Sequence, residues 1–231
     1  MREVVANFVS YLTSYIRRHK QKLFYVFLAE LSLIVITLIV LTSNTINESY
    51  LLPRVLFILI CAFGIVAGVS PSEFSFTKAE RVDGNGVSGH HPDCGLFTGH
   101  TVNFFGSHRC AGCTGLVVGA LVSLAGIFLL SPSLMIGKTI FWVGVLFVGL
   151  GLGQHFIDFG NGWVHLGLNI MLVLGSWFMF DSISSIGLGL LVQVYFLLVT
   201  MFWIWARIRI SQFTHVGVCA GCTEPCEHVF A

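Results

Sequence analysis

Six cysteines and several histidines lie in two short clusters of this chain, with spacings typical of metal-binding sites. The pentapeptide Cys-Ala-Gly-Cys-Thr occurs twice, at Cys110–Thr114 and at Cys219–Thr223. Each copy supplies a Cys-x-x-Cys pair, the spacing at which two thiolates from one tight turn can share a metal ion. Cys94 precedes the first pair and Cys226 follows the second, whereas Cys61 stands apart in an apolar run.

Two sets of metal ligands are compatible with these clusters. In one, both pairs form a single four-thiolate site from Cys110, Cys113, Cys219 and Cys222. In the other, each cluster holds its own ion and takes a histidine: His90, His91, His100 or His108 in the first cluster, and His215 or His228 in the second. The predicted metal ligands are Cys94, Cys110, Cys113, Cys219, Cys222, Cys226, His91 and His228.

Zinc is the expected metal. Four-coordinate sites rich in thiolates and built on Cys-x-x-Cys pairs are the usual structural zinc arrangement. An iron–sulfur cluster is the alternative, although the second cysteine cluster lacks the complete four-cysteine spacing of ferredoxins. Reduced thiols without any metal are the remaining interpretation.

The composition shows that lipid must be the solvent of this chain. Of its residues, 55% are hydrophobic and only 10% are charged, against roughly 25% charged in soluble domains. No basic patch with interleaved aromatic residues is present, so nucleic acid is not an expected partner. The sequence predicts an all-α polytopic membrane helix bundle with about six spans of some 20 residues each. These spans are Leu23–Ser43, Tyr50–Val69, Gly112–Leu130, Ile136–Phe156, Trp163–Phe180 and Ile183–Ala206.

Short connections and glycine spacing predict how these spans pack. The third and fourth spans, and the fifth and sixth, are expected to form antiparallel helix hairpins, with the weakest break at Asp181–Ser185. In the third span, Gly115 and Gly119 have the small-residue spacing that permits close contact between helices.

The distribution of positive charge predicts that both ends of the chain are cytoplasmic. Basic residues gather before the first span, after the sixth, and between the second and third: Arg2, Arg17, Arg18, Lys20, Lys22, Lys78, Arg81, Arg109, Arg207 and Arg209. The opposite loops hold only Arg54 and Lys138. Because cytoplasmic loops carry the excess of Lys and Arg, the orientation is N-in and C-in. Both cysteine clusters then face a reducing compartment, where metal binding or transient redox chemistry is expected rather than stable disulfides.

The chain accordingly divides into five parts. Residues 1–22 form a cytoplasmic segment whose apolar residues share one helical face; it either lies on the membrane as an amphipathic helix or extends the first span. Residues 23–70 hold the first two spans, and 71–111 form a cytoplasmic loop rich in Gly, His and Cys. Residues 112–206 hold the bundle of four spans, and 207–231 form a cytoplasmic Cys-rich tail.

Polar residues around the turn between the fourth and fifth spans predict a pocket beside the cysteines. Gln154, His155 and Asp158 end the fourth span, and His165 and Asn169 share one face of the fifth because they are four residues apart. Polar groups just inside a bilayer are costly, so they usually face the bundle interior or a wet cavity. The alternative is interfacial solvation of a short turn, in which Asp158 caps the next helix.

The segment His108-Arg109-Cys110-Ala-Gly-Cys113-Thr114-Gly115 resembles the motif of a family of small prokaryotic polytopic membrane proteins, the one labelled domain of unknown function 2085. In that family a cysteine precedes a Cys-x-x-Cys/Asp-Thr-Gly turn that leads straight into a membrane helix, and a later helix pair carries Asp, Gln and Asn near its turn. The matching residues are Cys94, Cys110, Cys113, Thr114, Gly115, Gln154, Asp158 and Asn169. The resemblance spans residues 94–175, leaves out the tail, and implies the multi-pass cytoplasmic membrane of a bacterium or archaeon without implying an activity.

Four functions remain compatible with these observations. The preferred one is an integral membrane protein whose zinc site at the cytoplasmic face orders the loop and tail or docks a protein partner. The second is a metal-ion transport or handling protein, although few charged residues or histidines lie deep in the spans. The third is a membrane thiol oxidoreductase that uses Cys110 and Cys113, and the fourth is a metal-dependent intramembrane hydrolase built on His155, Asp158 and His165.

Overall fold

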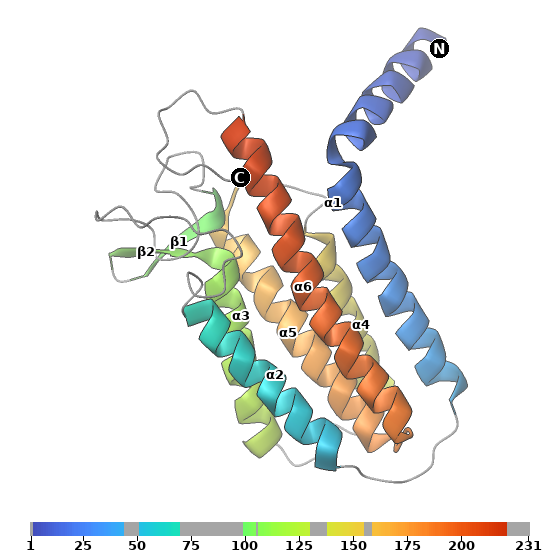
Figure 1. The fold of residues 1–231 in the computed structure, drawn as a ribbon, viewed down its shortest axis with the longest axis vertical. Coiled ribbons are helices and arrows are strands. Elements are labelled where there is room, and N and C mark those ends of the chain that lie inside the picture. Colours follow the sequence, from blue (N-terminus) through green and yellow to red (C-terminus); the bar gives the residue numbers. More distant parts are fainter. Residues whose placement is uncertain are drawn as a thin grey trace.

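A computed structural model of the chain describes residues 2–43, 51–69, 99–104, 106–129, 138–154 and 159–220. The side chains of residues 2–19, 138 and 212–220 lie outside this description. Across the described ranges the helices are α1 (Arg2–Thr42), α2 (Leu51–Val69), α3 (Ala111–Leu129), α4 (Lys138–Gly153), α5 (Gly162–Ser185) and α6 (Leu190–Ala220). They stand side by side as a helical bundle (Figure 1).

The helices have the length and apolarity of a multi-pass membrane protein. In the described part of the chain, five of them are long and apolar enough to cross a bilayer: Lys20–Thr42, Leu51–Val69, Ala111–Leu129, Gly162–Ser185 and Leu190–Ser211. The fourth predicted span is the exception. Its helix α4 has 16 residues, a rise of about 24 Å against a hydrocarbon core of about 30 Å. Large apolar side chains such as Phe63 and Phe128 point out of the bundle, where lipid chains would cover them.

Helix α5 lies between α3 and α4, and glycines allow both neighbours to approach it. On α3, a Cβ at Gly115 would lie 2.6 Å from the Leu166 carbonyl oxygen, and one at Gly119 would lie 2.8 Å from Val173 Cβ. The missing side chains therefore let the two backbones come together at the expected Gly115 and Gly119 positions.

Helix α4 approaches α5 in the same manner from another side. A Cβ at Gly144 would lie 2.8 Å from the Gly175 carbonyl oxygen, and one at Gly151 would lie 2.7 Å from Leu172 Cβ. These contacts make α5 the most buried of the five long helices in the described part of the chain.

The packing partners differ from the predicted helix hairpins. Helices α3 and α4 pack mainly on α5, and α6 packs along α1 more extensively than along α5. A hydrogen bond helps to select the last pair, because the Trp203 indole N–H of α6 donates to Ser32 Oγ of α1 at 2.8 Å. Consecutive helices still pack together in the pairs α4–α5 and α2–α3, whereas α3 with α5 and α1 with α6 join helices that are not consecutive in the chain.

Two helix boundaries also differ from the expected ones. Helix α5 continues to Ser185, and the turn to α6 falls at Gly187, whose φ of 72° suits a residue without a side chain. The Gln193 side chain then donates to the Leu188 carbonyl at 2.7 Å and ties the turn to α6. Helix α6 runs past Ala206, so the first part of the predicted tail is helical.

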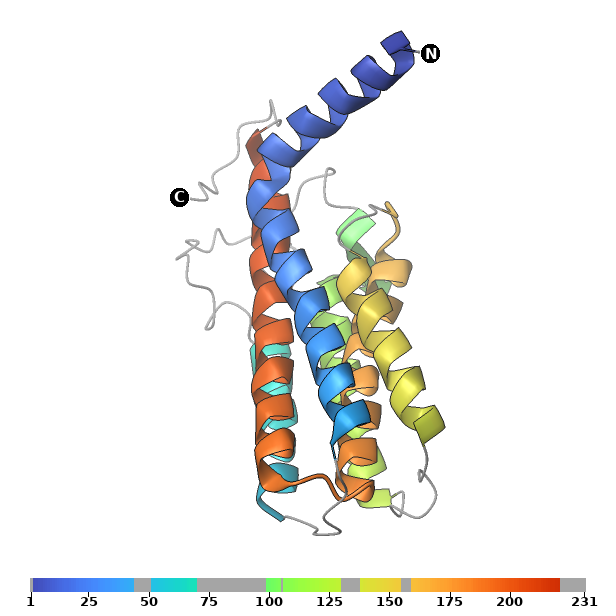
Figure 2. The same cartoon turned by 90° about the vertical axis from the view of Figure 1, so that its right-hand side faces the viewer.

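Helix α1 is one continuous helix that includes the predicted N-terminal segment. It runs from Arg2 to Thr42, and its N-terminal part tilts away from α6 beyond the bundle (Figures 1 and 2).

A short β-hairpin was not anticipated in the loop before the third span. Strand β1 (Thr101–Phe104) pairs antiparallel with β2 (Ser107–Cys110), with Thr101 opposite Cys110. Its turn contains Gly106 at φ 80°, whose backbone N–H donates to Asn103 Oδ1 at 3.1 Å. Because β2 leads into α3 without a break, the hairpin sets the position of Cys110 at the end of the bundle.

The approach of α3 to α5 predicts unequal effects for two Gly→Ala substitutions. Gly115→Ala forces a Cβ against α5 backbone and should cost roughly 1–3 kcal/mol of stability. Gly167→Ala is the matched control, because its Cβ meets nothing within 4 Å and alanine favours a helix by about 0.5–1 kcal/mol. Thermal unfolding of both variants in detergent measures the difference, and equal midpoints would contradict this packing.

Candidate functional site

The first Cys-x-x-Cys pair lies where β2 passes into α3. Cys110 is the last residue of β2 and is 4% exposed, and Cys113 lies in the first turn of α3. The two thiols are neighbours joined by a side-chain hydrogen bond and form no disulfide. Backbone N–H groups at a helix N-terminus lack intrahelical partners and stabilise negative charge placed there. The pair therefore lies at the N-terminal end of a helix that is long enough to cross a membrane.

Arg207 of α6 reaches this pair from across the bundle. Its guanidinium lies against Gly112, in the space that a Cβ at that position would occupy, and it interacts electrostatically with both thiols, Cys113 and Cys110. The arginine is 6% exposed. Because the residue at position 112 of the Cys-x-x-Cys turn is glycine, the turn leaves room for the buried guanidinium between the two cysteines.

A set of hydrogen bonds holds Arg207 in place. Its Nε–H donates to Asn169 Oδ1 on α5. The Asn169 amide in turn donates to the His165 carbonyl at 2.5 Å and to Gln154 Oε1 at 3.3 Å. Gln154 Oε1 also lies 3.4 Å from His165 Nδ1, and the Gln154 amide donates to the Gly151 carbonyl at 2.6 Å. These buried contacts connect α4 and α5 to the arginine that faces the thiols.

The segment before α3 rests on the start of α5 and covers this network. A Cβ at Gly162 would collide with the Thr101 carbonyl, so the first turn of α5 needs glycine where β1 crosses it. Next to β1, the His100 ring lies against the His165 ring with centroids 4.8 Å apart. Asn161 caps α5 through a 2.9 Å hydrogen bond from the Trp163 N–H. A second imidazole therefore joins the polar end of the bundle.

The structure brings together five residues that the sequence singled out, from opposite sides of the bundle end: Cys110, Cys113, Gln154, His165 and Asn169. Seven others lie outside the described residues: His91, Cys94, His155, Asp158, Cys222, Cys226 and His228. For Cys219, the backbone lies near the end of α6 and the side chain is not described. Among the residues that are described, no group of three or more His, Cys, Asp or Glu side chains could hold a metal ion. Zinc therefore stays a prediction.

Arg207 is the site residue that sequence reasoning missed. In the sequence it counts, with Arg209, among the basic residues that follow the sixth span and indicate the cytoplasmic side. A signal was present in the helical spacing, because Thr200 and Trp203 precede it at intervals of seven and four residues and share its face. All three side chains are buried.

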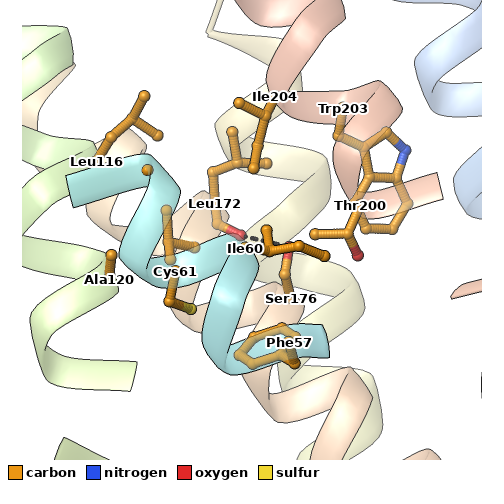
Figure 3. A pocket seen from close by; sticks show the side chains of 12 residues that line it. Phe57, Ile60, Cys61, Leu116, Ala120, Leu172, Ser176, Thr200, Trp203 and Ile204 are labelled. Carbon is orange, nitrogen blue, oxygen red and sulfur yellow. Dashed lines mark hydrogen bonds between the residues drawn. The ribbon is translucent and has the colours of Figure 1, made fainter. Parts of the chain in front are cut away.

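A separate small cavity lies deeper in the bundle. It measures about 30 Å³ and is lined by side chains of α2, α3, α5 and α6, including Cys61 and Phe57 (Figure 3). The hydroxyls of Ser176 and Thr200 on its wall donate to carbonyls of their own helices at 2.9 and 3.0 Å. A space of this size and lining accommodates no more than water, so it is a packing void and not a substrate site.

Comparisons with known proteins found no match: no family model, no curated protein and no solved structure corresponds to this chain. The resemblance to the family labelled domain of unknown function 2085 stays a prediction that rests on the motif around Cys110.

The hydrogen-bonding role of Asn169 predicts a large loss of stability on its removal. Asn169→Leu leaves the buried Arg207 guanidinium and the Gln154 amide each short of a partner, which should cost roughly 1–3 kcal/mol for each unsatisfied group. Asn103→Leu is the control, because Asn103 is exposed in the hairpin and water can replace the hydrogen bond that its side chain accepts from the Gly106 N–H. Thermal unfolding in detergent separates the two, and a midpoint for Asn169→Leu as high as that of the control would contradict the network.

Proposed function

We propose that this protein is a multi-pass membrane protein of a prokaryotic cell membrane that binds zinc through Cys110 and Cys113 at one end of its bundle. The metal would fix the loop before α3 and the segment after α6, and so present a rigid surface for a protein partner. The observation that carries the proposal is the Arg207 guanidinium, buried against Gly112 between the two cysteines and held there by Asn169.

Charge compensation explains why this arrangement favours a metal–thiolate site. Zinc binds cysteine as the thiolate, so a site with three or four such ligands carries net negative charge. A buried arginine is itself costly in a membrane bundle unless an anion or an acceptor faces it. Arg207 donates to the Asn169 oxygen, and the two cysteines, once ionised, would be the anions that act on it. The cation and the thiolates would offset each other's cost of burial.

The remaining ligands would come from the chain on either side of the described bundle. The end of α6, which carries Cys219, lies at the same end of the bundle as the start of α3, which carries Cys113, but extends beyond it (Figure 1). Candidates are Cys94 and His91 ahead of the hairpin, and Cys219, Cys222, Cys226 and His228 after it. Cys219 lies twelve residues beyond Arg207, a rise of about 18 Å along α6, so a site shared between the two clusters would need ligands such as Cys222, Cys226 or His228 to fold back toward α3. Structural zinc contributes on the order of 10 kcal/mol to such ordering.

Elemental analysis of protein purified without added metal tests the proposal. Wild type should contain stoichiometric zinc, and Cys110→Ser and Cys113→Ser should lose most of it because each removes a ligand. Cys61→Ser is the matched control, since Cys61 is buried in α2 away from the site. Cys219→Ser and Cys222→Ser should lose zinc as well if the clusters share one ion. Wild-type protein without zinc would overturn the proposal.

The role of Arg207 can be tested against that of its neighbour. Arg207→Gln should weaken zinc binding by roughly 10–100-fold, the range for residues that support metal ligands without touching the metal. Arg209→Gln removes the same charge two residues away and should leave the affinity unchanged. Equal affinities in the two variants would remove the charge-compensation argument.

Thiol–disulfide exchange is the second candidate, because the Cys110 and Cys113 sulfurs already contact each other. In that reaction the two thiols would form a disulfide while an added disulfide, such as oxidised glutathione, is reduced to two thiols. Metal-free protein that completes this exchange at Cys110 and Cys113, and loses it in either Ser variant, would favour this function over zinc binding.

The proposed orientation predicts the outcome of labelling from outside the cell. With both termini and both cysteine clusters in the cytoplasm, a membrane-impermeant thiol reagent should leave them unlabelled in intact cells treated to remove metal, and should label them after permeabilisation with a chelator present. A cysteine placed at residue 133, in the short connection between α3 and α4, is the control that should react from outside. Labelling of the two clusters in intact cells would reverse the orientation.

A further inference from the structure

A cleft opens between α1 and α6 at the end of the bundle that carries the cysteines. It has a volume of about 450 Å³ and is lined by Lys20, Gln21, Phe24, Tyr25 and Arg209. None of these residues belongs to the thiol site or to its hydrogen-bond network. The cleft is therefore a separate feature of the same end of the molecule.

The two helices are joined below the cleft and diverge at it. The indole of Trp203 donates to Ser32 Oγ at 2.8 Å, and the rings of Tyr25 and Trp205 meet at 5.3 Å. Beyond this point α1 tilts away from α6 in both views (Figures 1 and 2). The cleft is thus built into the way the helices pack, and the aromatic contact closes its floor.

The side chains of the cleft have the chemistry of a phosphate site beside a hydrocarbon surface. Lys20 and Arg209 supply two cations, and Gln21 and Tyr25 supply neutral hydrogen-bonding groups; no acidic side chain is among the residues that line it. Phe24 is 57% exposed at its edge. The cations and hydrogen-bonding groups would bind an anionic oxygen group on one side of the cleft, and Phe24 would contact an acyl chain on the other.

The position along the spans selects a lipid as the source of that phosphate. Lys20 begins the first apolar span and Ser211 ends the last, so the cleft lies at the level where apolar helix gives way to polar sequence. Lipid headgroups occupy this depth, and basic residues there attract anionic phospholipids.

We propose that this cleft binds the phosphate headgroup of an anionic phospholipid, with Lys20 and Arg209 as its cationic contacts and Phe24 against an acyl chain. The lipid would fill the space between α1 and α6 and hold the tilted part of α1 relative to the bundle. This site is independent of metal binding at the thiols.

Lipid binding to the full chain tests the proposal. Detergent-purified, delipidated protein is titrated with phosphatidylglycerol and, separately, with phosphatidylcholine, and bound lipid is counted by native mass spectrometry. Phosphatidylglycerol should bind with the higher affinity. The Lys20→Gln/Arg209→Gln double variant should lose roughly 30-fold of it, since each surface cation contributes about 1 kcal/mol to such binding. Lys22→Gln is the control, because it removes a charge outside the cleft and should retain wild-type affinity.

Two results would overturn the proposal. One is equal phosphatidylglycerol affinity in the double variant and the wild type. The other is displacement of the lipid by inorganic phosphate at equal concentration, which would assign the cleft to a soluble phosphate. Phe24→Ala further distinguishes a lipid from a soluble phosphate as the ligand, because it should weaken lipid binding and leave binding of inorganic phosphate unchanged. Circular dichroism of each variant confirms that the helices persist.

Discussion

The close approach of α3 and α4 to α5 is the constraint on which the rest of this structure depends. Glycines on both outer helices face α5, and a methyl group at Gly115 or Gly144 would meet backbone atoms of α5. Helices in lipid gain little from the hydrophobic effect, so close packing and hydrogen bonds must hold them together. The same contact places Asn169, which lies against Gly115, directly below the start of α3. The polar site is in this sense a consequence of how the apolar helices pack.

At that end of the bundle, polar groups are buried in a connected set and not singly. Asn169 joins Gln154, which directly follows α4, to Arg207 of α6, and Arg207 lies against Gly112 between the two cysteines at the start of α3. Each buried polar group would be costly alone, and each reduces the cost of the next by supplying its partner. A cation held beside two thiols by a neutral amide remains available to compensate negative charge on sulfur. A metal–thiolate site would supply such charge.

The two arginines of α6 show how one helix serves two sites. Arg207 and Arg209 are two residues apart, which is about 200° around a helix, so they point to different sides. Arg207 enters the bundle toward Asn169 and the thiols, whereas Arg209 lines the cleft beside α1. One charge therefore stabilises the interior of the bundle end, and the other faces the surface where headgroups lie. The two-residue spacing separates their directions, but only the packing of α6 decides which of them meets Asn169.

The amino-acid sequence alone determined the membrane class, the helices, and the local geometry of the residues that could do chemistry. Apolar length identified five spans, whereas the fourth predicted span has a shorter helix. A spacing of four residues put His165 and Asn169 on one face, because this follows from local helix geometry. Only the tertiary structure decided which helices touch and where Arg207 points. Partner choice depends on small faces meeting and on bonds such as Trp203 to Ser32, which join residues far apart in the chain. An arginine near a helix end can contact either a lipid headgroup or a buried acceptor. For Arg207, only the position of Asn169 on the neighbouring helix α5 shows that the partner is a buried acceptor.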